Sequence, residues 1–263
     1  MEHSLVIAQI SDSHLFAQPS SLHCGANVYQ HLLTVLQELK RNLDIDYIVF
    51  TGDLSQDHSE ASYQLFSQAV EQCCIETPIL FLSGNHDEPK LLIQYLKQAP
   101  FTPSKMIENQ YWQVILVESK SQLIQGPAGQ VDDTELTLLR QSINPSKNQL
   151  IFMHHHPVNV GYFIDRHGLN NSEKFWSVID DYPSIAGVAC GHVHRGSTLS
   201  KAETKRSVDV YTCPATSIQF DPLADTVKAL EQGPGYRLFN LQPNGQLKTS
   251  LHYSQSNFPL LKN

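Results

Sequence analysis

Five short polar blocks, each placed directly after a run of apolar and largely β-forming residues, constrain this chain more than any other feature. They contain seven of the thirteen histidines, together with carboxylates and one amide. A mixed nitrogen and oxygen set of this kind indicates a transition-metal centre of the hydrolytic type, because structural zinc usually draws on cysteines and the chain has no CxxC pair. The blocks are Asp12-Ser13-His14, Gly52-Asp53, Gly84-Asn85-His86-Asp87, His154-His155-His156-Pro157 and Gly191-His192-Val193-His194.

The first part of the chain alternates between strand patterns and helix patterns. Short apolar runs typical of buried strands are followed by segments in which apolar residues recur at helical spacing. Ser59 is a candidate helix cap, and Pro89 occupies a first-turn position that proline tolerates. This βαβαβα order predicts neighbouring parallel strands with helices on the faces of the sheet. The predicted strands cover residues 5–10, 47–50 and 79–82, and the predicted helices cover residues 27–43, 59–73 and 89–98.

The second part of the chain is richer in strand patterns. A hairpin turn is predicted at Pro243-Asn244-Gly245. No linker or low-complexity tract divides the halves, so we expect one domain over 1–263, with 197–263 forming its C-terminal strand-rich part. The predicted strands cover residues 111–118, 149–153, 185–190, 208–213, 216–220, 236–241 and 249–253, and the predicted helices cover 133–141 and 172–181.

Composition excludes several classes of protein. Over 263 residues, 41% hydrophobic and 17% charged residues are typical of a folded globular protein. A net charge of −8 without a basic run makes nucleic acid an unexpected partner, and the apolar runs are too short to span a membrane. The N-terminus lacks a signal-peptide pattern, and an odd count of five cysteines suits a reducing compartment. We therefore expect a cytoplasmic enzyme, whose oligomeric state the sequence leaves open.

The first three blocks offer metal ligands and an acid–base group. Asp12 and His14 are two residues apart, so at an extended strand end they would point to one face and bind one ion. Asp53 could bridge two cations, and Asn85 offers a neutral carbonyl ligand. The alternative reading of each short block is an ordinary polar turn.

His86 and Asp87 are the candidate catalytic residues. An imidazole can donate a proton to a leaving group near neutral pH, and an adjacent carboxylate could orient it as in a triad. The alternative for this block is a capped turn before the helix at Pro89.

The last two blocks are rich in histidine. Three consecutive histidines cannot share one face of a strand, so at most two of His154, His155 and His156 would face a site, and spacing alone does not say which one binds an ion. His192 and His194 repeat the same-face spacing of the first block, and a ligand pair is the favoured interpretation over an exposed loop.

The order and content of the five blocks resemble the calcineurin-like metallophosphoesterases, over about residues 5–200. The resemblance implies a four-layer αββα sandwich of two mixed sheets. It assigns His155 as the ligand of its block, because that histidine lies two residues before the proline, and leaves His154 and His156 in supporting positions. The implied ligands are Asp12, His14, Asp53 and His194 for one ion, and Asp53, Asn85, His155 and His192 for the other, with Asp53 bridging.

The same resemblance implies a mechanism and its cofactors. The two ions would be Fe together with Mn, a second Fe or Zn. They would hold a bridging hydroxide for in-line attack on a phosphoester. His86 would protonate the leaving oxygen or stabilise charge on the phosphoryl group. The side chains expected to contact the substrate are His14, Asp53, Asn85, His86 and His194.

Further runs are similar to the class III 3',5'-cyclic AMP phosphodiesterases of Gram-negative bacteria. They imply hydrolysis of cyclic AMP, a small-molecule substrate, to 5'-AMP. Another phosphodiesterase of the family, such as a glycerophosphodiesterase, would share every ligand and stays an alternative. A non-catalytic scaffold is disfavoured, because scaffolds usually lose ligands and all positions are filled here. The runs are 11–16, 52–57, 169–171, 213–220 and 233–237.

Overall fold

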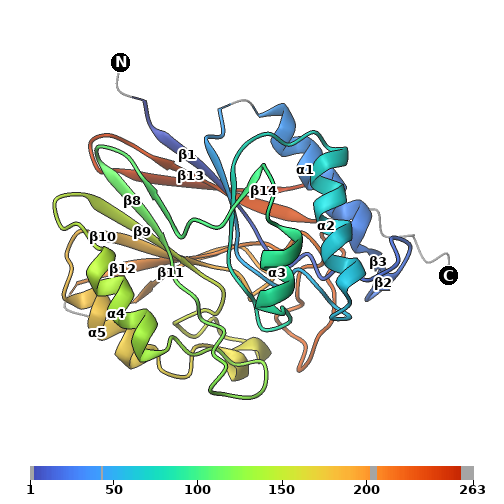
Figure 1. Cartoon of the computed structure of the whole chain (residues 1–263). Helices are drawn as coiled ribbons and strands as arrows, with labels where there is room; N and C mark the ends of the chain where they lie inside the picture. The colour runs from blue at the N-terminus through green and yellow to red at the C-terminus, as the bar shows by residue number, and fades with distance from the viewer. Residues whose placement is uncertain (1–2, 43, 202–205, 256–263) are drawn as a thin grey trace.

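Two six-stranded sheets form the centre of the molecule (Figure 1). The computed structural model describes residues 3–42, 44–201 and 206–255. The first sheet has the order β14-β13-β1-β4-β5-β6, in which β1, β4, β5 and β6 run parallel, β13 pairs antiparallel with β1, and β14 pairs antiparallel with β13. Its strands are β1 (Leu5–Ile10), β4 (Tyr47–Phe50), β5 (Ile79–Phe81), β6 (Phe101–Thr102), β13 (Gly235–Leu241) and β14 (Leu247–Tyr253).

The second sheet has the order β11-β12-β10-β9-β8-β7 and is also mixed. Strands β8, β9, β10 and β12 run parallel, while β7 and β11 lie antiparallel at the two edges. A separate two-stranded ladder pairs β2 (Leu22–His23) with β3 (Ala26–Asn27). The strands of the second sheet are β7 (Met106–Glu108), β8 (Trp112–Leu116), β9 (Asn148–Met153), β10 (Ile185–Cys190), β11 (Ser197–Lys201) and β12 (Val208–Thr212).

Helices cover the outer face of each sheet, as Figure 1 shows. Three pack on the first sheet and two on the second, while the short 3₁₀ helix η1 (Phe163–His167) lies in the loop after β9. The expected cap at Ser59 is present, since its side chain accepts from the amide of Ser62. The helices are α1 (Val28–Arg41), α2 (Glu60–Gln72), α3 (Pro89–Tyr95), α4 (Asp133–Ser142) and α5 (Ser172–Asp180).

Alternating side chains on central strands build three apolar layers. On β1, Ile7 points between the sheets, whereas Ala8 and Ile10 pack against the helices. On β9, Phe152 faces the other sheet and Met153 faces the helices. Both faces of these strands are therefore buried, which explains their continuous apolar runs. The αββα sandwich expected from the sequence is confirmed.

The structure differs from the predicted elements at residues 216–220, in three edge strands and in the β2–β3 ladder, which was also not predicted. Residues 216–220, expected to be a strand, form a loop whose hydrogen bonds go to other loops: the amide of Thr216 donates to Ser11 O at 2.9 Å and that of Phe220 to His194 O at 3.2 Å. The edge strands β6, β7 and β11 were not predicted, because they are short or lack an apolar alternation. Leu43, the expected end of the first helix, lies outside the described residues.

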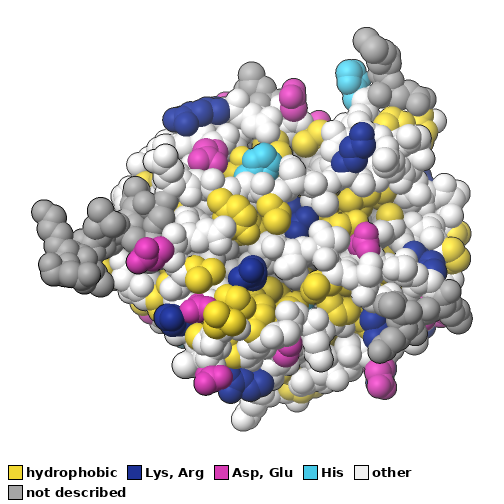
Figure 2. All heavy atoms as spheres, turned by 180° about the vertical axis from the view of Figure 1, so that it is seen from behind, with side chains coloured by type: hydrophobic (Ala, Val, Ile, Leu, Met, Phe, Trp, Pro, Cys, Tyr) yellow, Lys and Arg dark blue, Asp and Glu magenta, His cyan; other side chains and the backbone are white. Residues whose placement is uncertain are grey.

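The surface agrees with the charge balance of the sequence. On the face shown in Figure 2, lysine and arginine side chains are scattered among acidic and apolar ones instead of forming one basic patch. Among the helices of the described residues, none combines the length and apolar character needed to cross a membrane.

Candidate metal centre

The loops that follow five strands converge at one edge of the sandwich and carry the polar blocks. Because β1 and β4 are parallel neighbours, their following loops continue side by side: the amide of Asp12 donates to Gly52 O at 2.9 Å and that of His14 to Asp53 O at 3.0 Å. The loops after β5, β9 and β10 supply Asn85, His154 and His192. The fold thus gathers all five blocks.

The backbone at these positions is left-handed, not extended. The φ angles of Asp12, His14, Asp53, His192 and His194 lie between 44° and 64°. A non-glycine residue in this region is strained, and such strain concentrates at functional sites. We expected an extended chain to place Asp12 and His14 on one face, and likewise His192 and His194. That reason was wrong. The tight turns aim these side chains instead.

Asp12, His14 and His194 form a first cluster, whose ligand atoms lie within 4.8 Å of one another. His14 Nδ1 is 2.8 Å from the Gln56 side-chain oxygen, and His194 Nδ1 is 2.8 Å from the carbonyl of Ile218. Each Nδ1–H donates to its acceptor, so each Nε2 carries a lone pair.

These two Nε2 atoms face each other at 3.0 Å, and His194 Nε2 is 3.4 Å from Asp12 Oδ1. Two facing lone pairs beside a carboxylate are stabilised by a cation, so this first cluster fits a metal ion.

Asn85, His154 and His192 form a second cluster. His154 Nδ1 is 2.7 Å from the carbonyl of Thr51, and its Nε2 is 3.1 Å from Asn85 Oδ1. His192 Nε2 is buried without a hydrogen-bond partner. An orphaned buried nitrogen is costly unless a ligand or ion satisfies it. This second cluster therefore also fits a metal ion.

Asp53 lies between the two clusters. Its Oδ2 is 3.6 Å from His14 Nε2 and 3.4 Å from His154 Nε2, while its Oδ1 accepts the backbone amide of His86 at 2.8 Å. One carboxylate oxygen thus faces one imidazole of each cluster, which is the geometry a bridging ligand requires.

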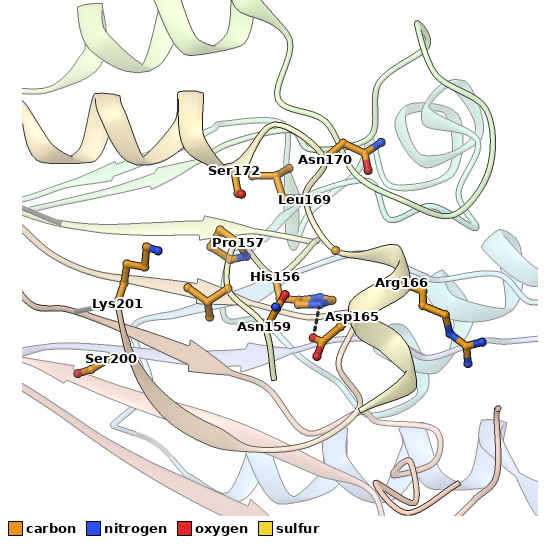
Figure 3. A pocket seen from close by; sticks show the side chains of 12 residues that line it. His156, Pro157, Asn159, Asp165, Arg166, Leu169, Asn170, Ser172, Ser200 and Lys201 are labelled. Carbon is orange, nitrogen blue, oxygen red and sulfur yellow. Dashed lines mark ion pairs between the residues drawn. The ribbon is translucent and has the colours of Figure 1, made fainter. Parts of the chain in front are cut away.

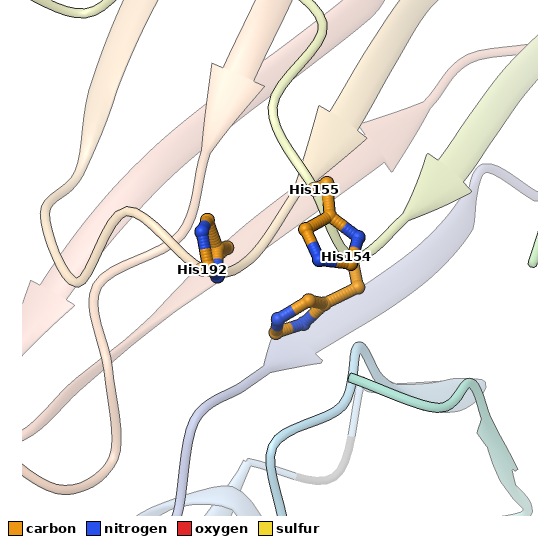
Figure 4. A group of neighbouring side chains, drawn as sticks. All are labelled: His154, His155 and His192. Atoms are coloured by element: carbon orange, nitrogen blue, oxygen red, sulfur yellow. The ribbon is translucent and has the colours of Figure 1, made fainter. Parts of the chain in front are cut away.

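His155 is near the second cluster but differs from His154 in its bonding. The two histidines and His192 can bring ligand atoms within 4.8 Å of one another, and Figure 4 shows the three rings together. Both ring nitrogens of His155 are already engaged, Nδ1 with Ser119 Oγ at 2.8 Å and Nε2 with Pro127 O at 3.1 Å. A carbonyl only accepts, so Nε2 donates to Pro127 and Nδ1 accepts from Ser119, which leaves no free lone pair.

His156 faces away toward a second cavity of about 470 Å³ (Figure 3). Its Nε2 is 3.3 Å from Asp165 Oδ1, and its ring stacks on that of His192 with centroids 5.6 Å apart. The supporting position of His156 that the resemblance implied stays a prediction.

Burial sets the charge state of these groups. It lowers the pKa of His14 and of His192 well below the ordinary value, so both are neutral imidazoles, as ligation requires. Burial alone would raise the pKa of Asp53, but the nearby His154, His86 and His14 hold it well below its usual range. Asp53 is therefore ionised.

Asp87 does not orient His86, contrary to the triad-like arrangement expected from the sequence. Its Oδ2 accepts the amides of Asp53 and Gly84, both at 2.8 Å, and its Oδ1 accepts that of Leu54 at 2.9 Å. The buried Nδ1 of His86 has no hydrogen-bond partner. Asp87 instead fixes the turn that carries Asp53.

Two glycines make room for that turn. Gly52 has φ +95°, which only glycine adopts readily. A Cβ on Gly84 would lie 2.1 Å from Asp53 Oδ1 and 2.3 Å from its backbone nitrogen. The glycine-aspartate and glycine-asparagine blocks are therefore parts of one close contact between two loops.

A cavity of about 380 Å³ opens over both clusters. Its lining includes all five side chains expected to contact the substrate, which are His14, Asp53, Asn85, His86 and His194. The lining also includes Phe163, Phe220 and Val227. The sequence alone did not indicate that Phe163 or Val227 belongs to the site. Phe163 lies after the histidine block, but no spacing rule connects it to the ligands.

Comparison with known proteins agrees with this geometry. Residues 5–196 match the family model for calcineurin-like phosphoesterases, and the chain belongs to this family. It is 53% identical over 250 residues to a probable cyclic nucleotide phosphodiesterase of Colwellia psychrerythraea, covering 94% of each chain. It is 34% identical to the 3',5'-cyclic adenosine monophosphate phosphodiesterase CpdA of Vibrio vulnificus, covering 95% of this chain and 90% of that one.

Solved structures share the fold at low sequence identity. A dimetal phosphatase from Danio rerio superposes with a TM-score of 0.64 at 12% identity, covering 91% of this chain and 93% of that one. A purple acid phosphatase from yellow lupin gives a TM-score of 0.63 at 13% identity, covering 97% of this chain and 55% of that one. As a member of the calcineurin-like phosphoesterases, the chain is a hydrolase.

Proposed function

We propose that this protein hydrolyses 3',5'-cyclic AMP to 5'-AMP in the cytoplasm, using two metal ions. The observation that carries the proposal is a single cavity that joins both ligand clusters, His86 and a wall that contains Phe163 and Phe220. The relative from Vibrio vulnificus supports the substrate by its name and by its match over most of this chain. Five free cysteines are compatible with a reducing compartment.

The proposed ligand set changes one residue of the sequence-based assignment. Asp53 would bind both ions, and His154, not His155, would be the ligand from its block. The Nε2 of His154, which lies 3.4 Å from Asp53 Oδ2 and 3.1 Å from Asn85 Oδ1, supports His154 as the ligand, whereas His155 donates from Nε2 to Pro127 O and accepts at Nδ1 from Ser119. One ion would then be held by Asp12, His14, Asp53 and His194, and the other by Asp53, Asn85, His154 and His192. Fe with Mn, two Fe or Zn suit such nitrogen and oxygen donors.

Bound cations supply charge neutralisation for the phosphoryl group and activation of water. The protein's own residues do the rest. His86 lines the cavity beside Asp53, with its ring 4.9 Å from that of His14, and would donate a proton to the oxygen that leaves when the ring of the cyclic diester opens. Asp87 would act through the backbone, by holding the Asp53 turn.

We also propose that the whole chain works as one domain. The strands β13 and β14 complete the first sheet and β11 and β12 the second, so the described part of 197–263 contributes to both sheets. Truncation before β11 would therefore expose an edge of each sheet.

The test is a direct assay of the purified protein reconstituted with Mn²⁺ or Fe. We expect conversion of cyclic AMP to 5'-AMP, followed by chromatography, and a loss of turnover after chelation that metal restores. A protein that carries two metal equivalents but hydrolyses generic diesters and not cyclic AMP would refute the substrate assignment.

A further inference from the structure

The cavity over the metal clusters has a second wall that catalysis at the phosphate does not need. Two segments form it: η1, and a hairpin-like loop from Phe220 to Ala229 that is closed by a bridge between these two residues. The lining side chains of this wall include the apolar Phe163, Ile164, Phe220 and Val227 together with the polar Arg166, His167, Asp225 and Thr226.

The wall is fixed in relation to the ligands. The Phe220 ring stacks on that of His194, with centroids 3.9 Å apart and an interplanar angle of 4°, and Phe163 packs on Phe220 at 5.2 Å. Arg166 of η1 donates to the carbonyl of Asp225 in the hairpin, which ties the two segments together. A molecule whose phosphate lies at the ligands would therefore meet this wall at a set distance.

Exposure separates the residues that support the wall from those that can touch a ligand. Phe220 is only 5% exposed, with one face covered by His194. Phe163 is partly exposed and lines the cavity, and Val227 is 45% exposed there. Phe220 is thus the support, and Phe163 with Val227 is the contact surface.

We propose that Phe163 and Val227 bind the aromatic base of the nucleotide and thereby determine substrate preference; this inference rests on the proposed function. Every nucleobase has an apolar π-face, which stacks on aromatic side chains whatever hydrogen-bond donors and acceptors lie on the edge of the base. A cavity of about 380 Å³ is at the lower end of small-molecule sites, which suits a mononucleotide. Phe163 and Val227 offer apolar surface to a base, and the polar Arg166, His167, Asp225 and Thr226 line the cavity beside them.

The experiment compares cyclic AMP with a base-free analogue, 1-deoxyribose 3',5'-cyclic phosphate, which has the same reacting diester. The wild-type protein should have the lower KM for cyclic AMP. Phe163→Ala should raise the KM for cyclic AMP about tenfold, with kcat changed less than about twofold, since one stacking contact is removed. The KM and kcat for the base-free diester should not change.

Controls separate base binding from support of the metal centre. Phe163→Leu keeps apolar packing on Phe220 and should give a smaller rise in KM. Val227→Ala should raise the KM for cyclic AMP modestly, while Leu223→Ala in the same hairpin should have no effect, because Leu223 is 93% exposed and does not line the cavity. Metal content should stay at the wild-type level in all four variants.

Three results would overturn the inference. Equal losses on both diesters, or a loss of metal in Phe163→Ala, would show that Phe163 only supports His194 through Phe220. A wild-type protein that hydrolyses the base-free diester as efficiently as cyclic AMP would show that the wall contributes nothing, while leaving the phosphodiesterase activity in place. A wild-type protein inactive on both would overturn the proposed function as well.

Discussion

The first and second clusters hold their imidazole rings in different ways. In the first, His14 and His194 each have an acceptor at Nδ1, so both Nε2 atoms are aimed before any ion arrives. In the second, only His154 has such an acceptor among the contacts described above, and His192 is stacked on His156 with its Nε2 unpartnered. Orientation of a ligand in advance raises affinity for the metal. We therefore expect the first cluster to bind its ion more tightly than the second.

Replacement of Asp53 should have the largest effect, because it is the element that the two clusters share. Asp53→Asn should nearly abolish hydrolysis of cyclic AMP and reduce metal content, since the charge facing both His14 and His154 is lost. The change is nearly isosteric, so the fold should survive, as circular dichroism would verify. Full activity with two metal equivalents would contradict the shared-ligand assignment.

The adjacent histidines test the second cluster alone. His154→Ala should remove one metal equivalent, measured by elemental analysis, together with most activity. His155→Ala should keep both equivalents, because its nitrogens bond to Ser119 and Pro127. It serves as the matched control, being the next residue and equally buried. Loss of metal in His155→Ala and not in His154→Ala would restore the assignment made from the position of the proline.

Replacement of His86 tests proton donation to the leaving group separately from metal binding by the two clusters. His86→Ala keeps the backbone amide that donates to Asp53, so both ions should remain bound. Turnover of cyclic AMP should fall about a hundredfold to ten-thousandfold, the usual contribution of a positioned general acid. The loss should shrink with bis-p-nitrophenyl phosphate, whose leaving group needs no proton. Equal losses on the two substrates would indicate stabilisation of phosphoryl charge instead.

Substitution of Gln56 tests how firmly the His14 ring of the first cluster is oriented, and its effect should be the smallest of those predicted here. Gln56→Leu removes the acceptor of His14 Nδ1–H and should weaken the tighter metal site about tenfold to a hundredfold in calorimetric titration. Gln68→Leu, on the exposed face of α2, is the control and should bind metal like the wild type. If Gln56→Leu weakens only the looser site, the ranking of the two clusters is reversed.

The sequence predicted the framework because local patterns encode it. The apolar runs before each block correspond to β1, β4, β5, β9 and β10, and parallel pairing then places the blocks at one edge. Residue type and chain order were sufficient to name most candidate ligands, since few other residues can bind a metal ion.

Details that depend on contacts distant in sequence could not be predicted. The choice between His154 and His155 depends on Thr51, Ser119 and Pro127, which lie on other loops. At the left-handed residues Asp12 and His14 the backbone amides likewise donate to Gly52 and Asp53, which lie on the neighbouring loop. The role of Asp87 was misread for the same reason, because its partners are backbone amides about thirty residues earlier as well as Gly84.

Anomalous diffraction from crystals of the protein loaded with Mn²⁺ tests the central claim most directly. We predict two peaks, one among Asp12, His14 and His194 and the other among Asn85, His154 and His192, with the Asp53 carboxylate bonded to both. At lower Mn²⁺ concentration the first peak should persist longer. A single peak, or a second peak bonded to His155 and not to His154, would contradict the account.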